Sequence, residues 1–306
     1  MIFFITIAIV LSFYVYTLYY SVKKHTILTG AFLGDTPSKE TIKTFKQMYG
    51  KKPYYVLLFT DWEKYPPEIV LQSILSEECC PVITWEPWYA KSKEGIPYQD
   101  IMSGKFDTYI DNFAQQLSGY KGPIYLRFAH EMNGNWYPWS SALIGHENYK
   151  ALFKYVRDRF TSLGVTQVRW IFSINWENVP QENDFTNAYP GDAYVDAIGL
   201  DGYNWGTTLE TSRWMNFREI FGPIYRTVSR VYDKTILITE FSSTSTGGNK
   251  SKWILNALSD MKKMNNLKGF ILFNVDKETD WKTLPAYGEE KLLSDSCFVD
   301  QVYQKK

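Results

Sequence analysis

Short apolar runs alternate with longer amphipathic stretches along most of this 306-residue chain. The runs are rich in β-branched and aromatic residues, which is typical of buried strands. Eight of them occur, at residues 27–34, 53–60, 80–87, 123–131, 168–176, 195–205, 235–243 and 268–276. Between them, helical periodicity predicts helices at roughly 38–48, 105–118, 147–162, 211–231 and 250–264.

Eight strand–helix units of this kind predict a (β/α)8 TIM barrel, which belongs to the α/β class. An open doubly wound sheet is the alternative. It is disfavoured because no G-x-G-x-x-G motif follows the first apolar run. The barrel would occupy residues 26–306 and form a single catalytic domain.

The first apolar segment of the chain, at residues 2–22, has a different character. It is uncharged, and as a helix it would be roughly 31 Å long, which is about the thickness of a bilayer core. No charged segment precedes it and no A-x-A site follows, so a cleaved signal peptide is disfavoured and a buried core helix is a further alternative. Four tyrosines gather toward one end, as in an aromatic belt: Tyr14, Tyr16, Tyr19 and Tyr20. We expect residues 1–25 to form an uncleaved N-terminal transmembrane helix.

Composition excludes several classes of partner. The 33 basic and 33 acidic residues cancel, so no clustered basic face for nucleic acid is indicated. Three Cys, two of them adjacent, make a disulfide scaffold or a Cys-based metal site improbable, and three His make a His-rich metal site improbable. Aromatic residues make up 17% of the chain, which fits either core filling or a sugar-binding cleft.

Carboxylates occur at the ends of predicted strands. Glu131 ends the fourth run and Glu240 ends the seventh. In a (β/α)8 barrel the C-terminal ends of the strands carry the active site. A retaining glycosidase needs two carboxyl groups there, one of them with a pKa raised by apolar walls and a neighbouring carboxylate. The indoles of Trp136, Trp139 and Trp205 are candidates for those walls and for stacking on sugar rings.

Each of these side chains also has a simpler interpretation. Glu131 is a possible helix-capping carboxylate, and Glu240 a possible partner of an arginine at the end of the barrel. Glu86 either contacts substrate or orders the loop that carries Trp88. Asp201 fits a buried hydrogen-bonding partner better than a catalytic group.

The stretch RFAHEMNGNWYPW, at 127–139, resembles the signature of glycoside hydrolase family 26, whose members are (β/α)8 retaining endo-β-glycanases. The resemblance extends through GLDGYNW at 199–205 and ITEFSS at 238–243 to Asp-Trp at 280–281. It covers roughly residues 28–290. It implies Glu131 as the acid/base, Glu240 as the nucleophile, and neither a cofactor nor a metal.

The resemblance also implies roles in substrate binding. His130 and Trp136 match an active-site His and a stacking Trp, and Tyr203 matches a Tyr that hydrogen-bonds the nucleophile. Trp281 matches a sugar platform. Arg127 is expected to support the fourth strand from inside the barrel. The remaining candidate substrate-binding residues are Glu86, Trp88 and Trp205.

Substrate preference is indicated by the end of the third run, which reads ITWEPW. Mannanases that the family resemblance brings in often carry a His in this region, and this chain has none between His25 and His130. This favours a β-1,4-linked or mixed-linkage β-glucan, with endo-β-1,4-mannanase as the alternative. A non-catalytic sugar-binding protein and a component of a polysaccharide export complex are alternatives of another class.

Two features predict opposite orientations for the expected membrane helix. Lys23 and Lys24 follow the helix, and the positive-inside rule would place the domain in the cytoplasm. Polysaccharide substrates of the resembled family lie outside the cell, and a large domain can be translocated regardless of local charge. We therefore expect an extracellular or periplasmic catalytic domain that is tethered to the membrane. There it would trim an exported polysaccharide, with the polysaccharide synthesis and export machinery as a candidate partner.

Overall fold

The computed structural model describes residues 25–283 and 292–301. The apolar run at 2–22, and with it the expected transmembrane helix, lies outside these ranges. Among the described helices, none combines the length and the apolar character that crossing a bilayer requires.

The predicted (β/α)8 barrel is confirmed. Each of eight parallel strands pairs with the next in chain order, and β11 pairs with both β10 and β2, which closes the ring. The two-residue strands β1 (Ile27–Leu28) and β12 (Phe298–Val299) extend the sheet beside β11. The eight barrel strands are β2 (Gly30–Phe32), β3 (Tyr55–Asp61), β4 (Cys80–Glu86), β7 (Ile124–Phe128), β8 (Val168–Asn175), β9 (Ala197–Asn204), β10 (Thr235–Ser243) and β11 (Leu267–Phe273).

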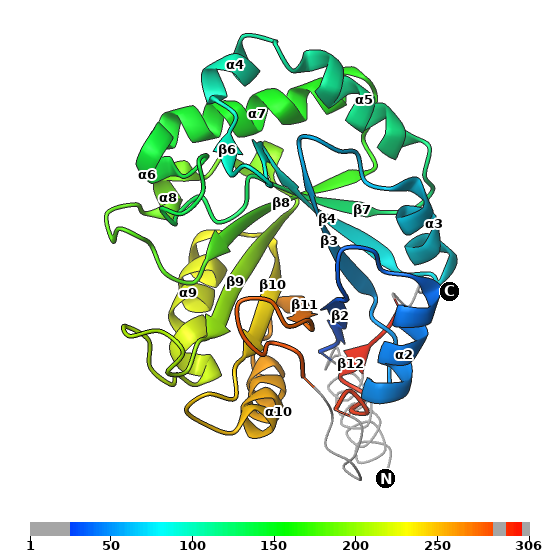
Figure 1. Cartoon of the computed structure of the whole chain (residues 1–306), viewed down its shortest axis with the longest axis vertical. Helices are drawn as coiled ribbons and strands as arrows, with labels where there is room; N and C mark the ends of the chain where they lie inside the picture. Colours follow the sequence, from blue (N-terminus) through cyan, green and yellow to red (C-terminus); the bar gives the residue numbers. More distant parts are fainter. Residues whose placement is uncertain (1–24, 284–291, 302–306) are drawn as a thin grey trace, which may run out of the picture.

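Helices surround the strands (Figure 1). The longer ones are α2 (Lys39–Tyr49), α3 (Glu68–Ser76), α5 (Asp107–Ser118), α7 (His146–Ser162), α9 (Phe217–Val231) and α10 (Lys250–Met261). The segments between the strands also carry the hairpin β5 (Trp88–Tyr89) and β6 (Glu94–Gly95), and the short helices α4 (Tyr98–Met102), α6 (Ser141–Ile144) and α8 (Phe185–Ala188). A 3-10 turn at Asp192–Tyr194 precedes β9.

Side chains alternate along the barrel strands between two hydrophobic clusters, as the two-residue period of a strand requires. One set fills the centre of the barrel and includes Leu57, Val82, Ile171, Leu237 and Ile271. The other set packs against the helices and includes Ile83, Leu126, Phe172, Leu200 and Ile238. The barrel is therefore a packed core at its N-terminal side, not a pore.

The inward positions nearer the C-terminal ends of the strands are polar. Thr84, Arg127, Ser173, Asp201 and Thr239 are all fully buried there. Gly199 makes room for this layer, because a Cβ at its position would lie 2.4 Å from Oγ1 of Thr239 and 2.8 Å from Oγ of Ser173. The polar layer forms the floor of the site described below.

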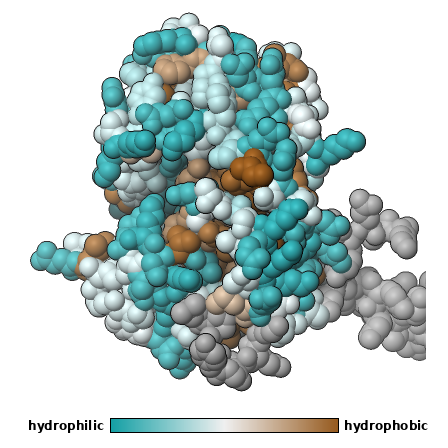
Figure 2. Space-filling model, turned by 45° about the vertical axis from the view of Figure 1, so that its right-hand side comes forward, coloured by the Kyte–Doolittle hydropathy of each residue, from teal (hydrophilic) through white to brown (hydrophobic). Residues whose placement is uncertain are grey.

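The outer surface that Figure 2 shows is mostly polar, with hydrophobic residues in separate small groups. The exposed large apolar side chains of the described residues are spread over different elements. They include Ile69 on α3, Leu143 on α6, Val231 on α9 and Leu255 on α10. Scattered exposed apolar residues of this kind are normal on a protein surface.

Candidate active site

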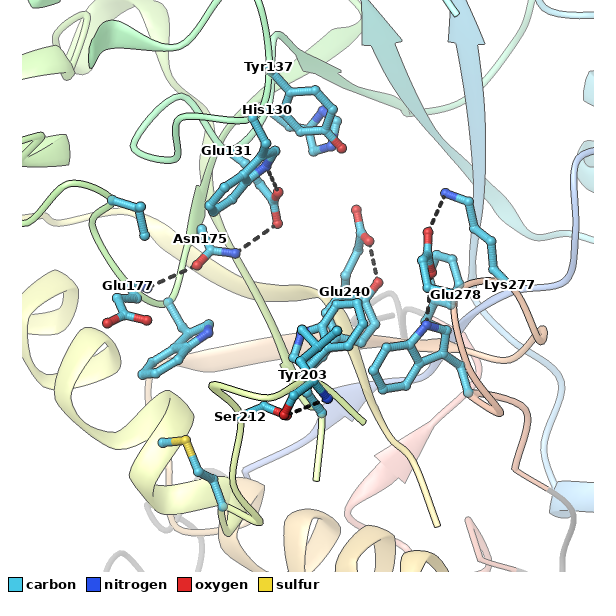
Figure 3. Close-up of a pocket in the computed structure, with 18 of the residues that line it drawn as sticks. His130, Glu131, Tyr137, Asn175, Glu177, Tyr203, Ser212, Glu240, Lys277 and Glu278 are labelled. Carbon is cyan, nitrogen blue, oxygen red and sulfur yellow. Dashed lines mark hydrogen bonds and ion pairs between the residues drawn. The ribbon is translucent and has the colours of Figure 1, made fainter. Parts of the chain in front are cut away.

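A cavity of about 740 Å³ opens at the C-terminal ends of the barrel strands. Its lining comes from strands β3, β8, β9, β10 and β11 and from the segments that follow β7, β8, β9 and β11. Glu131 and Glu240 both line it, as Figure 3 shows. The structure thus brings the two carboxylates of the sequence prediction into one cavity at the expected end of the barrel.

A β-bulge places Glu240. The pairing of β10 shifts register between Ile238 and Glu240 on its β9 side, and between Ile238 and Phe241 on its β11 side. Ile238 and Phe241 pack outward in the helix-facing cluster, while Thr239 and Glu240 both meet inward-facing groups. The extra residue therefore lets two consecutive side chains point into the barrel, which regular strand alternation forbids.

Glu131 lies just beyond a strand end. Strand β7 stops at Phe128, and both Ala129 (φ 48°) and Glu131 (φ 51°) adopt the left-handed conformation. This conformation is costly for residues other than glycine. The backbone N–H of Glu131 donates to the carbonyl of Ser173 on β8 at 2.9 Å, which fixes the strained turn against the barrel. Such strain commonly accompanies functional sites.

The carboxyl group of Glu131 is held by two neutral donors. Nδ2 of Asn175 donates to Oε1 at 3.1 Å and Nε1 of Trp136 donates to Oε2 at 2.9 Å. Burial, together with the charges of Asp201 and Glu240, raises the pKa of Glu131 to about 8, against the lowering effect of those two hydrogen bonds. Glu131 is therefore protonated at neutral pH.

Glu240 has a different environment. The guanidinium of Arg127 lies 2.8 Å from its Oε1, and the hydroxyl of Tyr203 donates to its Oε2 at 2.5 Å. A buried cation and a short hydrogen bond thus hold the two oxygens of this carboxyl group in place. The two carboxylates of the cavity thus have opposite surroundings, one neutral and one cationic.

Arg127 rises from β7 inside the barrel and is fully buried. Besides Glu240 it contacts Oδ2 of Asp201 at 2.7 Å. Asp201 also accepts hydrogen bonds from Ser173 at 2.7 Å and from Thr239 at 2.6 Å. Asp201 is thus the buried hydrogen-bonding partner that the sequence suggested, and Arg127 supports Glu240 as well as its own strand.

His130 lines the cavity and is almost completely buried. Burial and the positive charge of Arg127 hold its pKa well below the usual range, so the imidazole is neutral. Its ring lies 4.8 Å from that of Tyr137, which in turn stacks on Trp139 at 4.5 Å. His130 is therefore a neutral group of the wall, and its buried Nδ1 has no hydrogen-bond partner among the described residues.

The candidate aromatic walls are placed unequally. Trp136 is 44% exposed at the cavity, and Trp205 also lines it. Trp281 lines the cavity with only 1% of its surface exposed, and its ring lies 4.8 Å from the rings of both Tyr203 and Trp205. The expectation for Trp139 as a wall is wrong, because its indole is buried and donates to the carbonyl of His130 at 2.7 Å.

Glu86 and Trp88 lie beside the cavity but not among its lining residues. Nε1 of Trp88 donates to Oε2 of Glu86 at 3.2 Å, so part of the role of Glu86 is to order that loop. Burial raises the pKa of Glu86 to about 7, with a further rise from the charge of Glu240. Glu86 is thus close enough to Glu240 for the two charges to interact.

Several cavity residues were missed by the sequence prediction. Tyr137 lies in the quoted motif but was not singled out, while Lys277 and Glu278 lie in the loop after β11. Loop residues of this kind carry no periodic signal, and only the closed barrel brings them next to Glu240. No group of three or more His, Cys, Asp or Glu in the described part of the chain is arranged to hold a metal ion.

Comparison with known proteins gives a consistent result. Residues 86–266 match the model of glycosyl hydrolase family 26. The chain is 36% identical over 274 residues to endoglucanase H of Acetivibrio thermocellus, which covers 85% of this chain and 30% of that protein. It is 26% identical over 200 residues to a mannan endo-1,4-beta-mannosidase of Bifidobacterium adolescentis, which covers 61% of this chain and 19% of that protein. The chain therefore spans less than a third of the length of either relative.

Among solved structures, the Bacillus subtilis mannanase BCman superposes with a TM-score of 0.67 at 21% identity. The match covers 90% of this chain and 87% of that one. At this level of identity the likeness concerns the fold.

Proposed function

The chain belongs to glycosyl hydrolase family 26, and from this premise we propose that it is a retaining endo-β-glycanase that hydrolyses a β-1,4-linked or mixed-linkage β-glucan. One observation carries the proposal: two carboxyl groups line one cavity, one beside neutral donors and the other beside a cation. Glu131 is protonated among neutral donors, and Glu240 is held between Arg127 and Tyr203. A double-displacement glycosidase needs such a pair.

In the first step, a carboxylate oxygen of Glu240 attacks the anomeric carbon of the bound sugar. The proton of Glu131 passes to the glycosidic oxygen, and the bond between that oxygen and the anomeric carbon breaks. Arg127 and Tyr203 aim Glu240, because each holds one of its two oxygens. The product of this step is a glycosyl ester of Glu240 and a released aglycone.

In the second step, Glu131 is a carboxylate and accepts a proton from a water molecule. The oxygen of that water attacks the anomeric carbon, and the ester bond to Glu240 breaks. Two inversions give net retention of configuration. The hydrogen bonds from Asn175 and Trp136 stabilise the charged form of Glu131 at this stage.

Endo action is supported by the extent of the cavity. Its lining runs from Lys277 and Glu278 past Glu240 to Glu177 (Figure 3). A volume of about 740 Å³ exceeds the space of one sugar ring. Trp136 offers an exposed indole face beside Glu131, which suits the apolar face of a pyranose ring.

The choice of a glucan rests on two observations. The relative with 36% identity is named an endoglucanase, and the end of β4 carries Glu86 and Trp88 rather than a histidine. An endo-β-1,4-mannanase is the second candidate, since a relative with 26% identity is a mannan endo-1,4-beta-mannosidase.

Reducing-end release by the full chain tests the proposal. The substrates are mixed-linkage β-glucan, carboxymethyl-cellulose, β-mannan and β-1,3-xylan, with Glu131→Gln and Glu240→Gln as controls. We expect cleavage of mixed-linkage glucan or carboxymethyl-cellulose that both substitutions abolish. Cleavage of mannan alone would select the second candidate. Binding without cleavage of any polymer, by a folded protein, would favour the sugar-binding alternative.

We further propose that residues 1–25 anchor the enzyme to a membrane, with the barrel outside the cell or in the periplasm. The apolar run at 2–22 motivates this. Strand β1 begins at Ile27 at the N-terminal end of the barrel, opposite the cavity, so a tether there would leave the cavity facing away from the membrane. Recovery of the native chain in the soluble fraction, or its protection from protease added to spheroplasts, would contradict this proposal.

A further inference from the structure

Polar contacts around Trp281 join the loop after β11 to the end of β10 and the start of α10. We call this set of contacts the staple; it is made by Ser242, Thr244, Ser245, Lys250 and Asp280. On one side of the tryptophan, Asp280 reaches the segment that follows β10. The carbonyl of Trp281 itself accepts a hydrogen bond from Oγ of Ser242 at 2.6 Å, and both groups are buried. Ser242 lies two residues beyond Glu240, so the staple joins the indole to the strand that carries the proposed nucleophile.

Asp280 is the centre of the staple. Its Oδ1 accepts from Oγ1 of Thr244 at 2.5 Å, and its Oδ2 accepts from Oγ of Ser245 at 2.5 Å and from the backbone N–H of Ser245 at 3.1 Å. Together these hydrogen bonds hold the pKa of Asp280 below its usual range, although partial burial acts in the opposite direction. The carboxylate is therefore charged at neutral pH.

Lys250, the first residue of α10, completes the staple. Its Nζ lies 3.0 Å from Oδ2 of Asp280 and donates to the carbonyl of Lys282 at 3.0 Å and to the carbonyl of Asp280. Only 12% of the lysine side chain is exposed. One ammonium group thus holds the backbone on both sides of Trp281.

A chain of ring contacts leads from the staple to the reacting groups. The ring of Trp281 lies 4.8 Å from that of Tyr203, whose hydroxyl donates to Glu240 at 2.5 Å. The ring of Trp281 also meets Trp205 edge-on at 4.8 Å. A shift of Trp281 would therefore move the support of Tyr203 and the wall formed by Trp205 together.

We propose that Asp280 and Lys250 are positioning residues for the reaction: they fix Trp281, and through it Tyr203, in the arrangement that aims Glu240 at the anomeric carbon. Neither side chain lines the cavity. Their effect on catalysis is indirect and passes through Trp281. This inference rests on the proposed glycanase function.

Replacement of Asp280 by Asn tests the charge without removing volume. The lysine ammonium, two hydroxyls and a backbone N–H converge on the carboxylate. An amide in either orientation places an NH2 group against some of these donors, so the staple opens. Lys250→Met removes the cation and keeps the aliphatic stem, and therefore opens it from the other side.

The experiment measures kcat and KM on the preferred polymer for the full chain and for Asp280→Asn, Lys250→Met and Lys262→Met. Lys262 is the matched control, because it follows the other end of α10 and its one ion pair within the described ranges, with Asp295 at 2.8 Å, lies outside the cavity lining. Misplacement of reacting groups lowers kcat more than it raises KM, and we expect kcat/KM to fall about 10- to 100-fold in both staple variants. Lys262→Met should match the wild type.

A double-mutant cycle separates positioning from general loss of structure. Asp280→Asn is combined with Trp281→Ala, and kcat/KM is measured for all four proteins. If Asp280 acts through Trp281, Asp280→Asn should change kcat/KM by no more than about twofold once the indole is absent. A merely structural role would give the same loss in both backgrounds.

The outcomes are distinguishable from failure of the proposed function. Wild-type kcat/KM in Asp280→Asn, or additive losses in the cycle, would overturn the positioning role while the glycanase activity stands. A wild-type chain that cleaves none of the four polymers would overturn the proposed function and this inference with it.

Discussion

The hydroxyl of Tyr203 donates a 2.5 Å hydrogen bond to Oε2 of Glu240, the oxygen that Arg127 leaves free. Tyr203→Phe removes this bond and retains the ring that packs on Trp281. A hydrogen bond to a charged group contributes about 1.5–3 kcal/mol, so kcat/KM should fall about 10- to 100-fold. Steady-state kinetics on the preferred glucan measure this. An unchanged kcat/KM would show that Arg127 alone aims Glu240.

The pH dependence of activity should report Glu131. Its pKa is raised to about 8 by burial and by neighbouring carboxylates, and the first step needs its proton. We therefore expect kcat/KM to decline as pH rises through about 8. Glu131→Gln should lower kcat/KM for the polymer about 10²- to 10⁴-fold. A glycoside with a 2,4-dinitrophenolate leaving group, which needs no proton, should lose far less. Equal losses on both substrates would remove Glu131 from the acid role.

The same shift has a consequence for folding. Between the ordinary carboxyl pKa of 4.5 and about 8, folded Glu131 holds a proton that the unfolded chain has released. The folded state then binds more protons, so the free energy of unfolding falls as pH rises across this window. Glu131→Gln has no proton to lose. Urea denaturation at pH 5 and pH 8 should show the variant gaining stability relative to wild type at the higher pH. A constant difference would contradict the raised pKa.

The buried Arg127 neutralises the carboxylates of Asp201 and Glu240 beneath the cavity. Arg127→Met leaves Asp201 and Glu240 buried without their cation, which typically costs about 3–5 kcal/mol of stability. Urea denaturation measures the loss. Adding Asp201→Asn removes one of the stranded charges and should restore part of it. The loss of stability that Asp201→Asn causes in the wild-type background is the control. If Asp201→Asn causes the same loss in the Arg127→Met background, the two residues act independently.

Much of this fold could be predicted from the sequence, because each barrel strand is a short apolar run between amphipathic stretches. All eight predicted strands are present, and Ser38 caps α2 by exchanging hydrogen bonds with Thr41. The helix predicted at 211–231 begins later, at Phe217, because Asn216 and Glu219 form a capping box there. Helix α3 was not predicted, since it starts after two prolines and has little polar patterning.

The site was less legible than the fold. Glu131 and Glu240 could be chosen because strand ends meet at one rim of a barrel. The bulge that turns Glu240 inward, and the partnership of Arg127 with Asp201, depend on register and long-range packing that local sequence does not encode. Trp139 is a further example. The motif sequence does not distinguish a tryptophan that faces the cavity from one that is buried in the core, as Trp139 is.

The central claim is that Glu240 forms a covalent bond to the sugar. Incubation of the full chain with an activated 2-deoxy-2-fluoro-β-cellobioside slows release of the glycosyl ester, so that the intermediate accumulates. Mass spectrometry of the digested protein then locates the label. The account predicts one fluorocellobiosyl group per chain, on the peptide that contains Glu240. A label on Glu131 or Glu86, or turnover with inversion of configuration at the anomeric carbon, would contradict it.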